Sequence, residues 1–138
     1  MKQLIIANPG LRIMAENPRG TMLASIWEEG YRDSSENTLG LYSPDDCRYD
    51  HCKLCGSEYQ KPSCVHTNME AMVRRLQGRT YVCEKGQVCY RMREGGPGHV
   101  QLHGQSLKEA QVYPTMVAAL FAGAVIEQIG EDMVERAG

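Results

Sequence analysis

The chain has 138 residues, the length of one ordinary domain, so we treat residues 1–138 as a single domain. Hydrophobic residues make up 42% and charged residues 23% of the sequence, which is typical of a globular domain and excludes a fully disordered chain. The net charge of −2 excludes a general polyanion-binding protein.

The charge is unevenly distributed. Residues 1–46 carry a net charge of −3, residues 47–104 carry +4, and residues 105–138 carry −3. All six cysteines and all four histidines lie in the central segment. The sequence therefore predicts an acidic N-terminal part with strands and a helix, a basic zinc-binding centre rich in Cys and His, and a C-terminal helical segment.

Neither a targeting signal nor a membrane span is expected. The apolar run at residues 4–7 is too short for a signal peptide. The longest apolar run, residues 116–126, is shorter than the about 20 residues that a bilayer span needs. We expect a cytoplasmic protein without membrane contact, whose cysteines do not form disulfides because that compartment is reducing.

The first elements form a predicted hairpin and a helix. An apolar run over residues 2–7 ends at Asn8-Pro9-Gly10, a strong turn signal, and residues 11–15 are the expected partner strand. From Thr21 to Gly30 the apolar residues follow helical spacing.

A second helix is predicted at residues 68–77. Thr67 and Glu70 fit a capping box, the apolar side chains that follow recur at helical spacing, and Gly78 is a natural stop. Two β-rich runs around Lys85-Gly86 predict another hairpin, and alternation over residues 99–103 indicates an edge strand.

The C-terminal segment predicts a long helix. Ser106-Leu107-Lys108-Glu109 is a second capping box, and Pro114 should restart the helix near residues 115–136. Because residues 116–126 are apolar on every side, we expect this helix to be buried, in the core or in a homodimer. The fold prediction is a small zinc-stapled α+β domain with short hairpins. The expected interface residues are Met116, Leu120, Phe121 and Ile126.

The most informative motif is Cys52-Lys-Leu-Cys55-Gly56. Two thiolates at this spacing can bind one ion from a tight turn, and the motif resembles the zinc knuckle of zinc-ribbon and treble-clef modules. Cys64 and His66 form a further ligand pair just before the predicted helix, which resembles the treble-clef arrangement. One residue separates them, whereas two residues are usual in that arrangement. The expected zinc ligands are Cys52, Cys55, Cys64 and His66.

Other ligand sets remain open. Cys83 and Cys89 would face each other across the predicted hairpin, where they could close a zinc site with Cys52 and Cys55 or be core residues. Two zinc ions, an iron–sulfur cluster and metal-free cysteines are further alternatives. The alternate ligands are Cys47, His51, Cys83 and Cys89.

Catalysis is not indicated. The loop at residues 94–98 lacks the P-loop pattern, and no nucleophile elbow is present. His99 and His103 lie on one face of the predicted edge strand, so a small metal-dependent enzyme using them is one alternative.

The central segment also carries basic side chains interleaved with tyrosines, which is typical of nucleic-acid contact. The sequence favours a non-enzymatic, zinc-binding regulatory, adaptor or inhibitor protein with a macromolecular partner, most simply another protein. The alternative is a zinc-finger-type protein that binds DNA or RNA. Its candidate contact residues are Arg74, Arg75, Arg79, Lys85, Arg91 and Arg93.

Overall fold

The computed structural model describes residues 10–18, 30–37, 39–84, 88–103 and 114–138. Its centre is a three-stranded antiparallel sheet with the order β1-β3-β2. The strands are β1 (Met14–Pro18), β2 (Arg48–Asp50) and β3 (Pro62–Thr67). Ala15 pairs with His66 on one side of β3, and Tyr49 pairs with Ser63 on the other. The sheet and helices confirm a small α+β fold.

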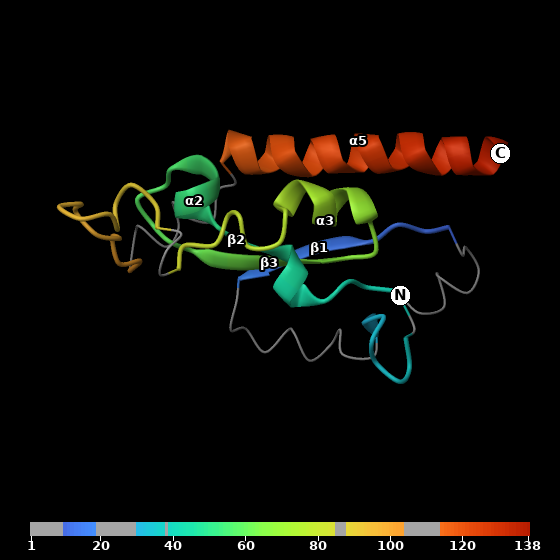
Figure 1. Cartoon of the computed structure of the whole chain (residues 1–138), viewed down its shortest axis with the longest axis horizontal. Coiled ribbons are helices and arrows are strands. Elements are labelled where there is room, and N and C mark those ends of the chain that lie inside the picture. The colour runs from blue at the N-terminus through green and yellow to red at the C-terminus, as the bar shows by residue number, and fades with distance from the viewer. Residues whose placement is uncertain (1–9, 19–29, 38, 85–87, 104–113) are drawn as a thin grey trace.

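Helices cover one side of this sheet. α2 (His51–Cys55), α3 (Glu70–Leu76) and α5 (Thr115–Ala137) lie together there, with α5 along the outside (Figure 1). A short 3-10 helix, η2 (Pro44–Cys47), precedes β2. None of the described helices is long and apolar enough to span a bilayer.

The main core lies between the sheet and these helices. Tyr49 of β2 is fully buried and meets Phe121 of α5 edge to face, with ring centroids 5.8 Å apart. The other buried members of this core are Cys47, Leu54, Val65, Met69, Met72, Leu76, Val117 and Ala124. The core therefore joins α5 to the part of the chain that contains the Cys/His motif.

α5 confirms the predicted C-terminal helix but corrects its burial. Only one face packs on the core, through side chains such as Val117 and Phe121. Met116 and Ile126 are 58% and 71% exposed, so the helix is not buried on all sides within one copy. The physical reason is size: α2 and α3, with Tyr49 of β2, cover one face of α5 and leave the opposite face outside the core.

The local capping prediction also needs correction. α3 begins at Glu70, and its N-cap is Met69, which makes no side-chain capping hydrogen bond. The Thr67 hydroxyl instead accepts the Met69 N–H at 3.1 Å and donates to the Ile13 carbonyl at 2.7 Å. Thr67 thus ties the chain before β1 to the start of α3, a tertiary role that the local pattern does not show.

Other predicted elements have different outcomes. The expected strand at residues 11–15 is found at Met14–Pro18 but pairs with β3. Three predicted elements lie outside the described residues: the partner strand at residues 2–7, the helix at residues 21–30 except its last residue Gly30, and the turn at residues 85–87. The described residues flanking that turn, and residues 99–103, contain no strand.

Candidate metal centre

Four side chains that can bind a metal ion converge at one end of the molecule. They are Cys52, Cys83, Cys89 and His99, and their ligand atoms all lie within 4.8 Å of one another. Cys52 and Cys89 are buried, and the other two are half-buried. Among the described residues, no other Cys, His, Asp or Glu group of three or more meets this geometry.

The spacing suits a tetrahedral ion. The His99 Nε2 atom lies 3.2 Å from the Cys89 Sγ and 3.8 Å from the Cys83 Sγ. Zinc–sulfur bonds of about 2.3 Å and zinc–nitrogen bonds of about 2.0 Å would separate tetrahedral S and N ligands by roughly 3.5 Å. Three thiolates and one imidazole also form a donor set that zinc prefers.

α2 positions the first ligand. Cys52 lies on this five-residue helix, which ends at Gly56 with a left-handed φ of 71°. Glycine adopts that conformation without the steric cost of a Cβ, so Gly56 lets the chain turn sharply after Cys55. The Gly56 N–H bonds the His51 carbonyl, which closes the helix.

Asp50 positions the second ligand. Its fully buried carboxylate accepts the Cys83 backbone N–H at 2.8 Å and the Gln60 side-chain amide at 3.0 Å. The Asp50 N–H bonds the Tyr81 carbonyl at 2.7 Å. These bonds hold residues 81–83 against β2, directly before α2.

A compact loop carries the other two ligands. The Gly98 N–H bonds the Arg91 carbonyl at 2.8 Å, and the Arg91 Nε donates back to the Gly98 carbonyl at 2.6 Å. A Cβ on Gly96 would lie 2.5 Å from the Arg91 carbonyl oxygen, so only glycine fits there. The Gly-rich segment therefore folds residues 89–99 into a loop that brings His99 to Cys89.

The three thiols have different environments. Burial and the neighbouring thiol of Cys83 raise the pKa of Cys52, and burial also raises the pKa of Cys83. At Cys89, burial opposes ionisation, but the backbone N–H groups of Arg91 and Met92 lower the pKa below its usual value. Backbone N–H groups that face a cysteine sulfur also stabilise the thiolate form that binds metal.

The structure brings together only part of the expected ligand set. Cys52 is in the cluster with two alternates, Cys83 and Cys89. Cys55 is outside it, and its Sγ donates to the His51 carbonyl at 3.1 Å. Because the motif forms a helix that uses this thiol for a backbone contact, the two cysteines do not share one cluster.

Cys64 and His66 lie elsewhere, on the central strand β3. Their side chains are two residues apart and thus on one face of the sheet, with the Sγ 3.8 Å from the His66 Nε2. The His66 Nδ1 is 3.0 Å from the Tyr31 hydroxyl. Burial lowers the pKa of His66. A continuous strand at residues 62–67, instead of a ligand-bearing loop, keeps both residues away from Cys52.

The remaining alternates are buried. Burial raises the pKa of the Cys47 thiol to about 12, with smaller contributions from Asp46 and Cys64. Burial also lowers the pKa of His51 to about 4. Neither residue belongs to the cluster of four.

The sequence predicts His99 only as a partner of His103 and not as a ligand beside the cysteines. The structure places its ring against Cys83 and Cys89 instead, while His103 is exposed. The spacing Cys83-x5-Cys89-x9-His99 is the signal that could have indicated this site, but the described residues 83–84 and 88–99 contain no helix or strand that fixes its register.

Several basic residues of the nucleic-acid alternative are paired with carboxylates. Arg74 bonds Glu127 and Glu131 of α5, and Arg75 bonds Glu127 at 2.9 Å. Arg79 pairs with Glu84, and Arg91 bonds the Gly98 carbonyl, while Lys85 lies outside the described residues. Much of the positive charge in this segment is therefore compensated within the chain.

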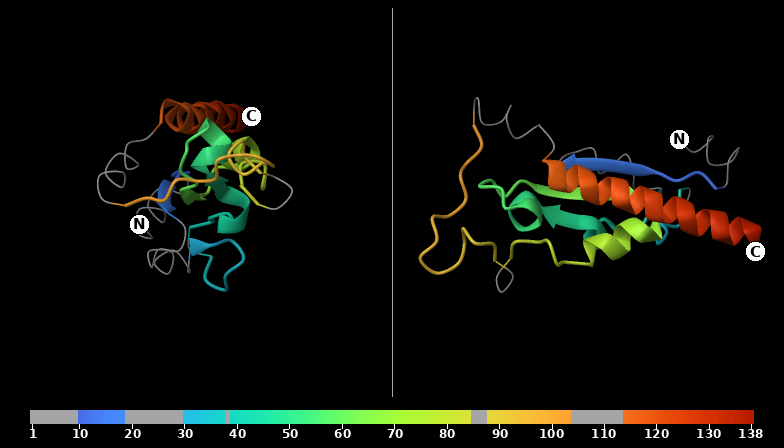
Figure 2. Two further views of the ribbon diagram at one scale, coloured as in Figure 1. Left: turned by 90° about the vertical axis from the view of Figure 1, so that its left-hand side faces the viewer. Right: turned by 90° about the horizontal axis from the view of Figure 1, so that it is seen from above.

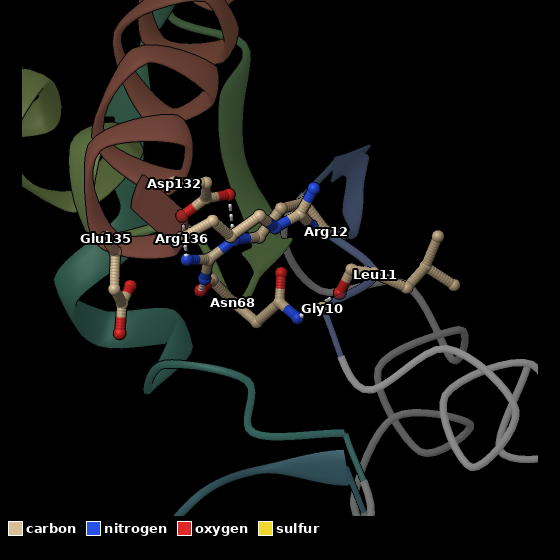
Figure 3. A pocket seen from close by; sticks show the side chains of 7 residues that line it. All are labelled: Gly10, Leu11, Arg12, Asn68, Asp132, Glu135 and Arg136. Carbon is tan, nitrogen blue, oxygen red and sulfur yellow. Dashed lines mark hydrogen bonds and ion pairs between the residues drawn. The ribbon is translucent and has the colours of Figure 1, made fainter. Parts of the chain in front are cut away.

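A separate polar pocket lies between the chain before β1, Asn68 and the end of α5 (Figure 3). Arg12 connects two sides of this pocket: its Nε donates to Asp132 at 2.8 Å, and a terminal nitrogen donates to the Asn68 carbonyl at 2.9 Å. This arrangement joins α5 to the N-terminal part of the fold, and we assign it a structural role.

Comparison with known proteins adds no relative: no protein-family model, no curated protein and no solved structure matches the chain.

Proposed function

We propose that this protein is a small, non-enzymatic zinc-binding module, whose single zinc ion is held by Cys52, Cys83, Cys89 and His99. The observation that supports this proposal is the convergence of all four ligand atoms within 4.8 Å. They come from three separate parts of the chain: α2, the segment after α3, and the Gly-rich loop.

The donor count favours a structural ion. Zinc sites with four protein ligands are closed, whereas catalytic zinc sites keep one position for water or substrate. Three cysteines and one histidine would complete the tetrahedron without an open position. This chemistry supports a role in folding and not in catalysis.

The ion would stabilise a segment that has little regular structure. The described residues 77–84 and 88–103 contain no helix or strand, although they include three of the four ligands. A long irregular segment buries few apolar contacts, so its ordering costs conformational entropy that few contacts offset. Zinc binding would join this segment to α2 and contribute directly to folding free energy.

We propose that the biological role is that of a regulatory, adaptor or inhibitor protein, which acts by binding another protein. Two properties support it over the nucleic-acid alternative. Arg74, Arg75 and Arg79 are paired within the chain. Among the described residues, the five most exposed large apolar side chains all lie on α5. Exposed apolar clusters are typical of protein contact sites.

Metal analysis of serine and alanine variants tests the zinc site. Protein purified without chelator should contain about one zinc per chain. Cys52→Ser, Cys83→Ser, Cys89→Ser and His99→Ala should each lose most of that zinc, and amide exchange in residues 77–103 should accelerate.

Two matched controls make this test specific. Cys55→Ser changes the other cysteine of the same motif, and His103→Ala changes the other histidine of the same segment. Both variants should retain about one zinc per chain, because neither residue is in the cluster. Loss of zinc from Cys55→Ser but not from Cys83→Ser would contradict the proposed ligand set.

A further inference from the structure

α5 has two faces of different character. Val117, Phe121, Ala124 and Gln128 are buried against the core. At 3.6 residues per turn, the opposite side of the helix carries a stripe that we call the outward face. All of its members are exposed: Thr115, Ala119, Ala122, Ile126, Gly130, Met133 and Ala137.

The outward face contains no charged residue, although α5 has five. Glu127 and Glu131 turn toward α3, where they bond Arg74, and Asp132 bonds Arg12. Glu135 and Arg136 line the pocket near Arg12. A helix that faced only water would carry its charges on the outside, so the reversed pattern of α5 indicates a covered face.

No described segment covers this face. Seen from above, α5 lies in front of the other described elements and runs along the length of the molecule (Figure 2). Ile126 and Met133 are 71% and 64% exposed. A shallow hollow beside this face is lined by Ile126, Gly130 and Val134 together with Glu127, Glu131 and Glu135.

We propose that the outward face binds the same face of a second copy, with the two α5 helices antiparallel and a twofold axis at Ile126. The positions of the face are symmetric about this residue. Ala122 and Gly130 lie four positions on either side, Ala119 and Met133 seven, and Thr115 and Ala137 eleven. An antiparallel twofold pair places the two members of each pair opposite each other.

The side chains suit this register. Ile126 would meet its own copy at the axis, and Ala122 would face Gly130, which lets the helices approach closely. Farther out, the long Met133 side chain would fill the space above the small Ala119. The members recur at intervals of four, three and four residues, an 11-residue repeat close to the helical period, so the stripe runs almost parallel to the helix axis.

The charge distribution favours the antiparallel orientation. Residues 115–126 have no charge, whereas the second half of α5 carries Glu127, Glu131, Asp132 and Glu135. A parallel pair would place the two acidic halves side by side. An antiparallel pair places each acidic half beside an uncharged half and also opposes the two helix dipoles.

The size of the contact predicts a reversible dimer. A 23-residue helix is about 34 Å long, so its outward face would bury on the order of 500 Å² per copy. The total of about 1,000 Å² is at the lower limit for a specific interface, and we expect a dissociation constant near the micromolar range.

The inference rests on the proposed role as a protein-binding module but not on its zinc site, and the experiment separates the two. Sedimentation equilibrium of zinc-loaded protein over a concentration series should show a monomer–dimer equilibrium. Ile126→Asp should weaken it by at least about tenfold, because two carboxylates would be buried at the axis. Met14→Asp, which changes an exposed residue of β1, should leave the equilibrium unchanged.

Thiol trapping tests the register. After oxidation with oxidised glutathione, Ile126→Cys should form a disulfide with its own copy, mapped by peptide mass spectrometry. Ala119→Cys should cross-link to Met133→Cys in a mixture but not to itself. A monomer at all concentrations, a dimer unaffected by Ile126→Asp, or cross-linking of Ala119→Cys to itself would overturn the proposal. A monomer that contains one zinc per chain would overturn this proposal alone.

Discussion

The carboxylate of Asp50 accepts the backbone N–H of Cys83 at 2.8 Å, which joins β2 to a candidate metal ligand 33 residues later in the chain. The same carboxylate oxygen accepts the Gln60 amide at 3.0 Å. Asp50 is fully buried and precedes α2, so it connects the two segments that provide Cys52 and Cys83.

Asp50→Ala should weaken zinc binding by about tenfold, because residues that orient metal ligands typically affect affinity to that extent. The change removes the one oxygen that accepts both the Cys83 N–H and the Gln60 amide, so both donors lose their partner. Competition with a zinc chelator measures the change. Asp45→Ala is the matched control because the Asp45 side chain is 79% exposed, and the zinc affinity of this variant should equal that of the wild type. Equal affinities for both variants would show that Asp50 does not position Cys83.

Gln128 makes a second long-range contact. Its side-chain oxygen accepts the Ala71 N–H at 3.0 Å, and its nitrogen donates to Asp132 at 3.0 Å. Gln128→Ala would leave a buried N–H at the start of α3 without a partner, which should cost about 1–3 kcal/mol. Urea unfolding in zinc-containing buffer measures this cost. Gln101→Ala, a change of the same kind at an exposed position, should alter the free energy of unfolding by less than about 0.5 kcal/mol. An equal effect of the two changes would contradict a stabilising bond between Gln128 and the Ala71 N–H.

Arg12 and Asp132 predict a dependence on pH. The hydrogen bonds from Arg12 lower the pKa of Asp132 from 3.8 to about 2. A carboxyl whose pKa is lower in the folded state stabilises the fold above its unfolded pKa, and this stabilisation is lost as the pH falls toward the folded pKa.

Asp132→Asn should therefore reduce the free energy of unfolding by about 1 kcal/mol at pH 7, a value limited by partial exposure of the pair. The difference between the two proteins should stay constant down to about pH 5 and shrink from about pH 4 downward. Loss of metal in acid affects both proteins equally, so the comparison isolates Asp132. Thermal unfolding at several pH values tests it, and a difference that grows in acid would be inconsistent with the ion pair.

The helices with strong local signals could be predicted from the sequence. The run after Pro114 and the apolar spacing before Gly78 specified α5 and α3, because the 3.6-residue period is a local property. The sequence could not show which side of α5 would be covered. Its apolar residues surround the helix from 116 to 126. Ile126 stays exposed because α2 and α3 are large enough to cover only one face of α5.

The metal centre was harder to predict because its ligands are far apart in sequence. The Asp50 carboxylate holds Cys83 near Cys52, and the turn that requires Gly96 brings His99 to Cys89. The local motif Cys52-x-x-Cys55 suggested that both cysteines bind one ion. In the structure the Cys55 thiol donates to the His51 carbonyl within α2, whereas Cys52 belongs to the metal cluster. The spacing of the two cysteines does not reveal this difference.

X-ray absorption at the zinc edge tests the central claim most directly, because it counts the sulfur and nitrogen neighbours of the bound ion. Protein purified with zinc should show three sulfur atoms at about 2.3 Å and one nitrogen at about 2.0 Å, and His99→Ala should remove the nitrogen or the metal. Four sulfur neighbours, two sulfurs with two nitrogens, or a spectrum unchanged in His99→Ala would contradict a site formed by Cys52, Cys83, Cys89 and His99.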